Sequence, residues 1–139
     1  MIHLIVGTKG KGKTKILIDK ANNNVKDVKG SVVYIDQSMR HMYELNNKIR
    51  YVKIKEFGIA NRDEFIGFFI VIISQNRDTE QIYLDGLLKL DAVESEDISY
   101  IIKKLDTICS AHNIDMTISL SAEKEDLEAE LQEMVETAL

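Results

Sequence analysis

The eight residues from Gly7 to Thr14 form the segment of this chain whose types and spacing point most directly to chemistry. They fit the pattern G-x-x-x-x-G-K-[ST] without a mismatch. Glycines permit backbone conformations in which successive N–H groups turn inward around a phosphate, and a helix that follows adds the positive end of its dipole. The pattern therefore predicts a loop that binds a nucleoside triphosphate, with ATP and Mg²⁺ as the first expectation.

Each loop residue has an expected role. The backbone around the phosphates is expected from Gly7, Thr8, Lys9, Gly10, Lys11 and Gly12. Lys13 is placed to reach the β- and γ-phosphates, and the Thr14 hydroxyl is placed to be a ligand of Mg²⁺. The alternative is a lysine-rich surface turn that binds nothing, but such a turn needs neither three glycines nor a Lys-Thr pair.

A second Mg²⁺ ligand is expected from an Asp that ends a buried apolar strand. Two segments have this form, Ile82-Tyr83-Leu84-Asp85 and Val33-Tyr34-Ile35-Asp36. Asp85 also has a plainer interpretation, as the first residue of a turn before Gly86. The strand pattern alone does not choose between the two carboxylates.

The residue that orients the attacking water is less clear. Many ATPases place a Glu directly after the Mg²⁺-binding Asp, whereas Gly86 follows Asp85 here. Asp36 or Gln37, at the end of the strand after the first helix, could orient water by hydrogen bonding.

Other polar residues are candidates for accessory groups at the nucleotide site. Ser119 and Ser121 could reach a γ-phosphate, although Ser121 fits a helix cap better. An arginine could act on the nucleotide of a neighbouring subunit, and the chain has four: Arg40, Arg50, Arg62 and Arg77. His3, His41 and His112 share no ligand-like spacing and are interpreted as structural.

Alternating strands and helices must position these residues. Strands are expected at 2–6, 31–36, 49–55 (an edge strand), 81–85 and 114–120. Helices are expected at 13–24, from Ser38 through Leu45, after an Asn61–Glu64 capping box, from Ser95 to Asn113, and from Ser121 onward. In the last helix, Leu127, Leu131, Met134 and Ala138 would form an apolar stripe. This order predicts an α/β fold: a three-layer sandwich with a mostly parallel sheet of about five strands, forming one nucleotide-binding domain over 1–139.

Composition narrows the class of protein. The 139 residues suit one domain; neither a signal peptide nor an apolar run of the ~20 residues needed to span a membrane is present. The single cysteine, Cys109, is expected to pack in a helix and fits a reducing cytoplasm. Residues 1–55 carry 12 Lys/Arg and 4 Asp/Glu, whereas residues 56–139 carry 6 and 19. Triphosphate charge explains the lysines of the loop, so nucleic acid is not an expected partner.

The phosphate-loop pattern and the strand order resemble the P-loop NTPase superfamily, with Asp85 ending a Walker B-like strand. The resemblance favours Asp85 over Asp36 as the metal ligand, because Asp85 follows a long connecting helix. Asp36 and Gln37 resemble the RecA-type arrangement, in which a carboxylate after the second strand activates water. The chain is also similar to small bacterial proteins labelled twitching-motility ATPases, and its Gly-Lys-Gly-Lys-Thr stretch is similar to the loop of ATP:corrinoid adenosyltransferases, which have an Asp-Glu pair where this chain has Asp85-Gly86.

Three functional hypotheses follow. The first is a slow Mg²⁺-dependent ATPase or ATP-dependent switch, completed by a protein partner or a neighbouring subunit, with the acidic segment after Ser121 as a candidate contact surface. The second is a nucleotide-binding interaction module without chemistry. The third is a small-molecule kinase or adenosyltransferase-like enzyme, for which the helical segment from Glu56 to Thr79, with two arginines, offers no evident lid.

Overall fold

The sheet of this protein contains six parallel strands in the residues that the computed structural model describes, 1–87 and 93–139. The strands are β1 (Ile2–Val6), β2 (Ser31–Asp36), β3 (Ile49–Lys53), β4 (Thr79–Leu84), β5 (Asp115–Leu120) and β6 (Val135–Ala138). Their order in space is β3-β2-β4-β5-β1-β6. All carboxyl ends therefore meet at one end of the sheet, where open α/β sheets bind ligands.

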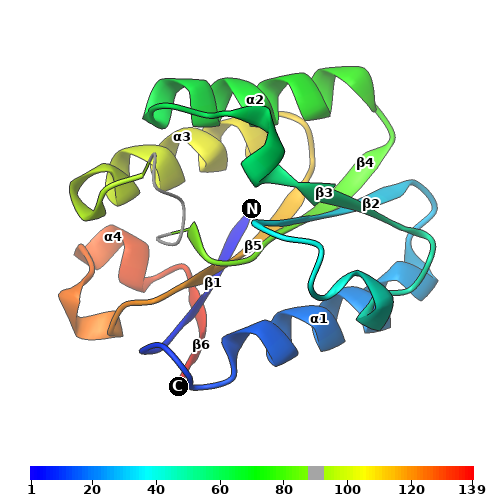
Figure 1. Cartoon of the computed structure of the whole chain (residues 1–139). Helices are drawn as coiled ribbons and strands as arrows, with labels where there is room; N and C mark the ends of the chain where they lie inside the picture. The colour runs from blue at the N-terminus through cyan, green and yellow to red at the C-terminus, as the bar shows by residue number, and fades with distance from the viewer. Residues whose placement is uncertain (88–92) are drawn as a thin grey trace.

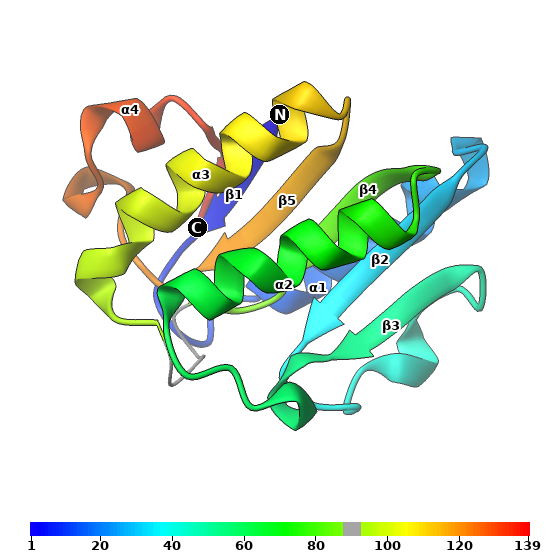
Figure 2. The same ribbon diagram turned by 90° about the horizontal axis from the view of Figure 1, so that it is seen from above.

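Helices cover both faces of this sheet, as Figures 1 and 2 show. One face packs on α1 (Lys13–Asn24), which buries Leu17 and Ala21 against it. The other face packs on α2 (Arg62–Gln75) and α3 (Ile98–Ala111), where Phe65, Phe69, Ile101 and Leu105 are fully buried. The predicted three-layer α/β sandwich is confirmed, with one strand more than expected.

The extra strand replaces most of the helix predicted after Ser121, and that prediction is wrong. Only α4 (Ala129–Gln132) is α-helical, after a 3₁₀ turn at Lys124–Asp126, and the chain then enters β6 beside β1. Leu131 is buried as its helical spacing suggested. Val135 and Thr137 are β-branched, and backbone pairing with β1 outweighs the helical spacing of the segment.

Two predicted helix caps are also wrong. Ser38 begins no helix: its hydroxyl accepts from the N–H of Arg40 (3.3 Å), and only a 3₁₀ turn at Met42–Glu44 follows. Ser95 lies inside a 3₁₀ turn, Ser95–Asp97, whose cap is Glu94. Ser38 belongs to a local turn because a side chain that hydrogen-bonds nearby backbone competes with helix formation.

Other predicted boundaries are confirmed. Asn61 caps α2, since its Oδ1 accepts from the N–H of Glu64 (2.9 Å). Asn113 ends the segment of α3 with a φ of 55°, and Cys109 is buried in that helix. None of the helices in the described residues is long and apolar enough to cross a membrane.

Candidate functional site

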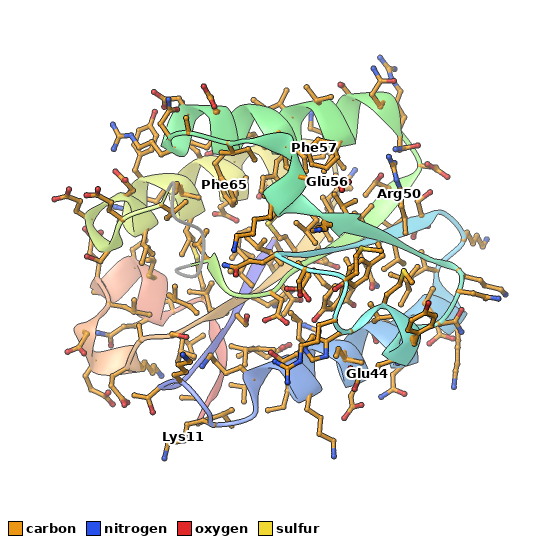
Figure 3. All side chains as sticks on the ribbon, in the orientation of Figure 1. Lys11, Glu44, Arg50, Glu56, Phe57 and Phe65 are labelled. Carbon is orange, nitrogen blue, oxygen red and sulfur yellow. The ribbon has the colours of Figure 1, made fainter. Side chains whose placement is uncertain are left out.

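The loop from Gly7 to Gly12 connects the carboxyl end of β1 to the start of α1, as its pattern predicted. Gly10 (φ 88°) and Gly12 (φ 94°) adopt left-handed conformations that side chains rarely adopt. A Cβ at either position would meet no atom within 4 Å, so backbone conformation and not space explains these two glycines. Lys11, between them, is exposed and points away from the rest of the molecule (Figure 3).

The first turn of α1 is arranged to receive an anion. Among the described residues no side chain caps this helix, and its first turn holds no acidic residue. The first backbone N–H groups of a helix lack internal partners and carry the positive end of its dipole. A phosphate at this end would therefore meet N–H donors and no competing carboxylate from the helix itself.

Gly7 has a different reason to be glycine. A Cβ there would lie 3.0 Å from the Cβ of Leu139, tighter than ordinary contact. Leu139 is held in place because its N–H donates to the carbonyl of Val6 (2.9 Å). The end of β6 thus packs directly on the start of the loop, a contact that the sequence did not predict.

Lys13 folds back over the loop. Its side chain is buried, with 7% of the residue exposed, and its Nζ donates to the carbonyl oxygen of Thr8 (3.0 Å). The loop encloses a hollow of about 310 Å³ lined by Lys9, Gly10, Gly12, Lys13, Thr14, Asp85 and Ser121. The structure thus brings most of the predicted phosphate-loop residues and the predicted metal ligand Asp85 around one space.

Asp85 lies directly beside Thr14. The Thr14 Oγ1 donates to Asp85 Oδ1 (3.2 Å) although the two residues are 71 positions apart. Ser119 Oγ donates to the same oxygen (2.9 Å), and the Tyr34 hydroxyl donates to Oδ2 (3.1 Å). Asp85 is only 4% exposed, and three hydroxyl donors compensate for the water that its carboxylate loses.

Tyr34 is a fixed proton donor to this carboxylate. Burial raises the pKa of its hydroxyl above the usual value for tyrosine, and the charge of Asp85 raises it further. The hydroxyl therefore keeps its proton at any physiological pH, so its bond to Asp85 is not broken by titration.

Asp36 lies next to Asp85 at the carboxyl end of the sheet. β2 and β4 are neighbours, and the N–H of Asp85 donates to the carbonyl of Ile35 (2.9 Å). The carboxylate of Asp36 accepts from the Tyr51 hydroxyl and from the N–H of Gln37, both at 2.7 Å. Burial raises the pKa of Asp36, the bond from Tyr51 opposes that rise, and the charge of Asp85 adds to it.

Three tyrosines form a row across neighbouring strands, and two of them, Tyr34 and Tyr51, hold these two carboxylates. Tyr34 lies opposite Tyr51 on one side and Tyr83 on the other, with ring centroids 5.7 Å and 6.4 Å away. This row was not predicted, although the sequence contains a signal for it. In both Val-Tyr-Ile-Asp and Ile-Tyr-Leu-Asp the tyrosine precedes the aspartate by two residues, so both lie on one face of a strand.

The remaining candidates divide between the site and the surface. Gln37 follows Asp36, and its side-chain Nε2 is buried with no hydrogen-bond partner among the described residues. Ser121 lines the hollow and caps no helix, whereas Ser119 is bound to Asp85 and also accepts from the N–H of Gly86 (2.7 Å). Gly86 has a left-handed φ of 76°, which explains why glycine stands where many ATPases have Glu.

The arginines and histidines lie outside this cluster. Arg62 pairs with Asp97 (3.3 Å) and stacks over Tyr100, whereas Arg40, Arg50 and Arg77 are exposed. His3 lies 3.5 Å from Asp115, and His41 contacts Glu44 at 2.5 Å. In the described part of the chain, no group of three or more His, Cys, Asp or Glu side chains could hold a metal by itself.

No protein-family model and no curated protein matches the sequence. Among solved structures, the KaiC-like protein PH0186 from the hyperthermophilic archaeon Pyrococcus horikoshii OT3 is similar, with a TM-score of 0.63 and 18% identity, over 95% of this chain and 67% of that chain. The pCW3 conjugation coupling protein TcpA, in its monomer form with ATPγS, aligns over 86% of this chain and 42% of its own, with a TM-score of 0.47 and 15% identity. The first similarity confirms the α/β fold with its parallel sheet.

Proposed function

We propose that this chain binds ATP with Mg²⁺ in the loop from Gly7 to Thr14 and acts as a slow ATPase or an ATP-dependent switch. The observation that carries this proposal is the bond from Thr14 Oγ1 to Asp85 Oδ1 (3.2 Å), which joins the loop to a strand two positions away in the sheet. A threonine hydroxyl that gives its proton to a carboxylate directs its lone pairs elsewhere, where a cation could accept them.

The donor set around Thr14 fits Mg²⁺. The ion prefers oxygen ligands and usually keeps several waters, so one or two protein oxygens beside the phosphates are enough. A hydroxyl from Thr14 and a carboxylate from Asp85 supply that number. When bound, Mg²⁺ would neutralise charge on the β- and γ-phosphates.

The loop would hold the phosphates with its own groups. Its backbone N–H groups and the first turn of α1 would donate to the β-phosphate. Lys13 Nζ would exchange the carbonyl of Thr8 for a γ-phosphate oxygen, a short movement for a side chain already lying over the loop. Lys9, also at the hollow, would add positive charge.

Asp36 is the proposed group that orients water. Its carboxylate lies beside Asp85 at the end of the sheet, and a buried carboxylate with a raised pKa is a stronger base than an exposed one. The buried, unpaired amide of Gln37 would gain a partner if a water or phosphate oxygen entered the site. Because no Glu follows Asp85, hydrolysis by the chain alone is expected to be slow.

The test is titration calorimetry with ATP and Mg²⁺ together with a phosphate-release assay. Lys13→Ala should abolish binding, whereas the control variant Lys26→Ala should bind ATP like the unaltered chain, since Lys26 is exposed and lies outside the loop. Asp36→Asn should retain binding and lose release. Absence of ATP binding in the unaltered chain would contradict the proposal.

A second candidate is a nucleotide-binding module without chemistry, which the left-handed Gly86 favours because it leaves the usual position of a catalytic Glu without a side chain. Tight binding with no phosphate release would support that candidate. The kinase alternative gains no support from the segment that would have to form its lid, since α2 packs an apolar face on the sheet. We further propose that residues 1–139 act as one nucleotide-binding domain, since both core clusters share a single sheet.

A further inference from the structure

The two outer edges of the sheet carry opposite charge. Around β3, at one end of the strand order, lies a set of basic side chains, here called the basic edge: Arg40, Lys48, Arg50, Lys53 and Lys55. Around α4 and β6, at the other end, lies a set of exposed acidic side chains, here called the acidic edge: Glu123, Glu125, Asp126 and Glu133. Figure 2 shows α4 and β3 at opposite ends of the molecule.

Three neighbouring acids, Glu128, Glu130 and Glu136, are ion-paired, whereas in the part of the chain that the structure describes the side chains that define the two edges are not. In the described residues, none of the ion pairs involves a member of the basic edge or of the acidic edge. Near the basic edge lie the acids Glu44 and Glu56, and Asp36 is opposite Lys53 in the sheet. Within the acidic edge lies one base, Lys124, so each edge keeps an excess of one sign. Both edges are therefore available to a partner of opposite charge.

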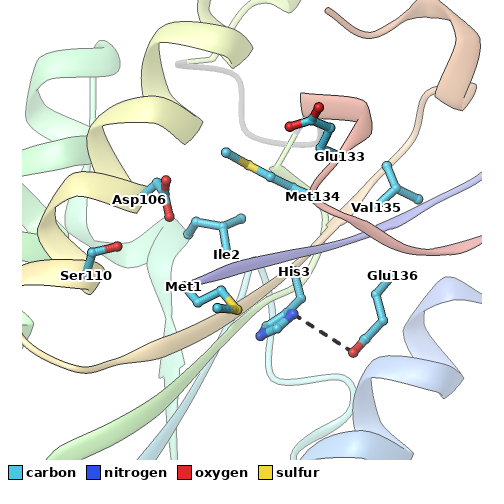
Figure 4. Close-up of a pocket in the computed structure, with 9 residues that line it drawn as sticks. All are labelled: Met1, Ile2, His3, Asp106, Ser110, Glu133, Met134, Val135 and Glu136. Carbon is cyan, nitrogen blue, oxygen red and sulfur yellow. Dashed lines mark ion pairs between the residues drawn. The ribbon is translucent and has the colours of Figure 1, made fainter. Parts of the chain in front are cut away.

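The segment beside the acidic edge is attached to α3. Glu128 receives bonds from Ser99 (2.8 Å) and Lys103 (2.9 Å), which attach α3 to the segment before α4. Just before α3, Glu94 and Glu96 are two further exposed acidic side chains. Figure 4 shows Glu133 and Glu136 beside β1, at a hollow of about 520 Å³ near the amino ends of the strands.

Both edges also have open backbone. Among the described strands β3 pairs only with β2, and β6 pairs only with β1. The outer side of each strand thus presents unpaired N–H and C=O groups, which can accept another strand. All six strands run in one direction, so β6 of one copy could extend the sheet of the next copy beside β3 without a change of direction.

We propose that this chain associates head to tail with a second copy of itself, the acidic edge of one copy lying on the basic edge of the next. A second copy is favoured over a nucleic acid because the surface of complementary charge is present in the same chain. Such a contact uses two different surfaces, so it leaves one free surface of each kind and permits rings or longer assemblies.

The contact would connect two parts of the candidate site. β6 ends at Ala138, and the next residue, Leu139, packs on Gly7 at the phosphate loop. β3 holds Tyr51, whose hydroxyl bonds to Asp36. Association would therefore join the strand beside the phosphate loop of one copy to the strand that holds Asp36 in the next, although the proposal does not require ATP to bind.

Sedimentation velocity of the full chain over a range of concentrations tests this proposal. The average mass should rise with concentration at low salt and return to that of a monomer at about 1 M salt, where the Debye length is about 3 Å. The double variants Arg50→Glu/Lys55→Glu and Glu125→Lys/Asp126→Lys should each be monomeric at low salt. An equal mixture of the two should associate, which also shows that both variants are folded.

The matched control is Lys26→Glu/Lys29→Glu, which makes the same change of charge at exposed positions that belong to neither edge and should associate like the unaltered chain. A chain that stays monomeric at every concentration at low salt overturns the proposal, as does association that survives both edge variants. A third result would also overturn it: the unaltered chain stays monomeric but binds a single-stranded oligonucleotide, and Arg50→Glu/Lys55→Glu loses that binding. The basic edge would then be a nucleic-acid surface.

Discussion

Tyr34 and Tyr51 lie ring against ring on neighbouring strands, with centroids 5.7 Å apart and ring planes within 11° of each other, and each donates its hydroxyl to a different carboxylate. Tyr34 donates to Asp85 and Tyr51 donates to Asp36. The pair thus fixes the distance between the proposed metal ligand and the proposed water-orienting group. Stacked rings in a packed core move little, so the two carboxylates are held in place before any ligand arrives.

Tyr34→Phe should destabilise the protein by about 1–3 kcal/mol. The substitution keeps the ring and its stacking but removes the donor to Asp85 Oδ2, which leaves a buried charged oxygen without that partner. Urea unfolding measures the change. Tyr43→Phe is the control, since Tyr43 is 92% exposed and its change should stay within about 0.5 kcal/mol. Equal stability of the two variants would contradict the role given to Tyr34.

Tyr51→Phe should move the acidic limb of the pH profile of phosphate release to higher pH. The Tyr51 hydroxyl bonds to the ionised form of Asp36 and so lowers a pKa that burial raises. Without that bond the pKa of Asp36 rises further, and the ionised form required by the proposed mechanism appears only at higher pH. A limb at the same pH in both proteins would show that Asp36 does not control the reaction.

Asp36→Asn should stabilise the protein at neutral pH by about 0.5–2 kcal/mol while removing hydrolysis. The pKa of Asp36 is raised in the folded protein, so folding favours its protonated form. The free energy of unfolding therefore falls as pH rises from 3.8 through the folded pKa, because the buried carboxyl becomes charged. An Asn fits the site: it can accept from Gln37 N–H and donate to the Tyr51 oxygen, whose proton can go to Ser38 O (2.7 Å).

Unfolding by urea at several pH values checks this prediction. The gain in the Asn variant should be present at pH 7 and should vanish below pH 3.8, where Asp36 is protonated in both states. Asp19→Asn, an exposed substitution on α1, serves as the control and should change stability by less than about 0.5 kcal/mol. Loss of stability at pH 7 in Asp36→Asn would mean that hydrogen bonding outweighs burial at this carboxylate.

The sequence predicted the elements whose signals are local. Ser31–Asp36 is a strand with the bounds expected from its apolar run. The phosphate loop was recognisable because its glycines are required by the backbone conformation at their own positions. Residues 135–138 were assigned to a helix because Leu127, Leu131 and Met134 have helical spacing. These residues form a strand because they pair with β1, which lies more than 125 residues earlier in the chain. A local sequence pattern cannot predict such a pairing.

The same limit applies to the candidate site. Thr14, Asp36 and Asp85 were identified from motifs, but which of the two carboxylates contacts Thr14 depends on the order of strands in the sheet. The bonds from Tyr34, Tyr51 and Ser119 depend on that order too, because each crosses between neighbouring strands. Residue types and spacing thus predicted which groups could take part in chemistry, whereas the strand order determines which of them are in contact.

Gly86→Glu should destabilise the protein by about 1–2 kcal/mol and should not increase phosphate release. Gly86 has a φ of 76°, and a side chain in the left-handed region costs about that amount. Gly67→Ala is the contrasting control: Gly67 lies inside α2, and a Cβ there would meet no atom within 4 Å, so alanine should stabilise by about 0.5–1 kcal/mol. Faster hydrolysis in Gly86→Glu would show that the backbone can adapt to the usual catalytic arrangement.

Asn61→Ala and Ser95→Ala should change the free energy of unfolding by different amounts, although both residues were predicted as helix caps. Asn61 Oδ1 accepts from the N–H of Glu64, and loss of such a cap costs about 1 kcal/mol. Ser95 has no capping bond, because Glu94 holds that position, so its substitution should change the free energy of unfolding by less than about 0.5 kcal/mol. Urea unfolding of both variants measures the difference. If Ser95→Ala cost as much as Asn61→Ala, the start of α3 would have to be capped by Ser95 in solution, and the role of Glu94 would be wrong.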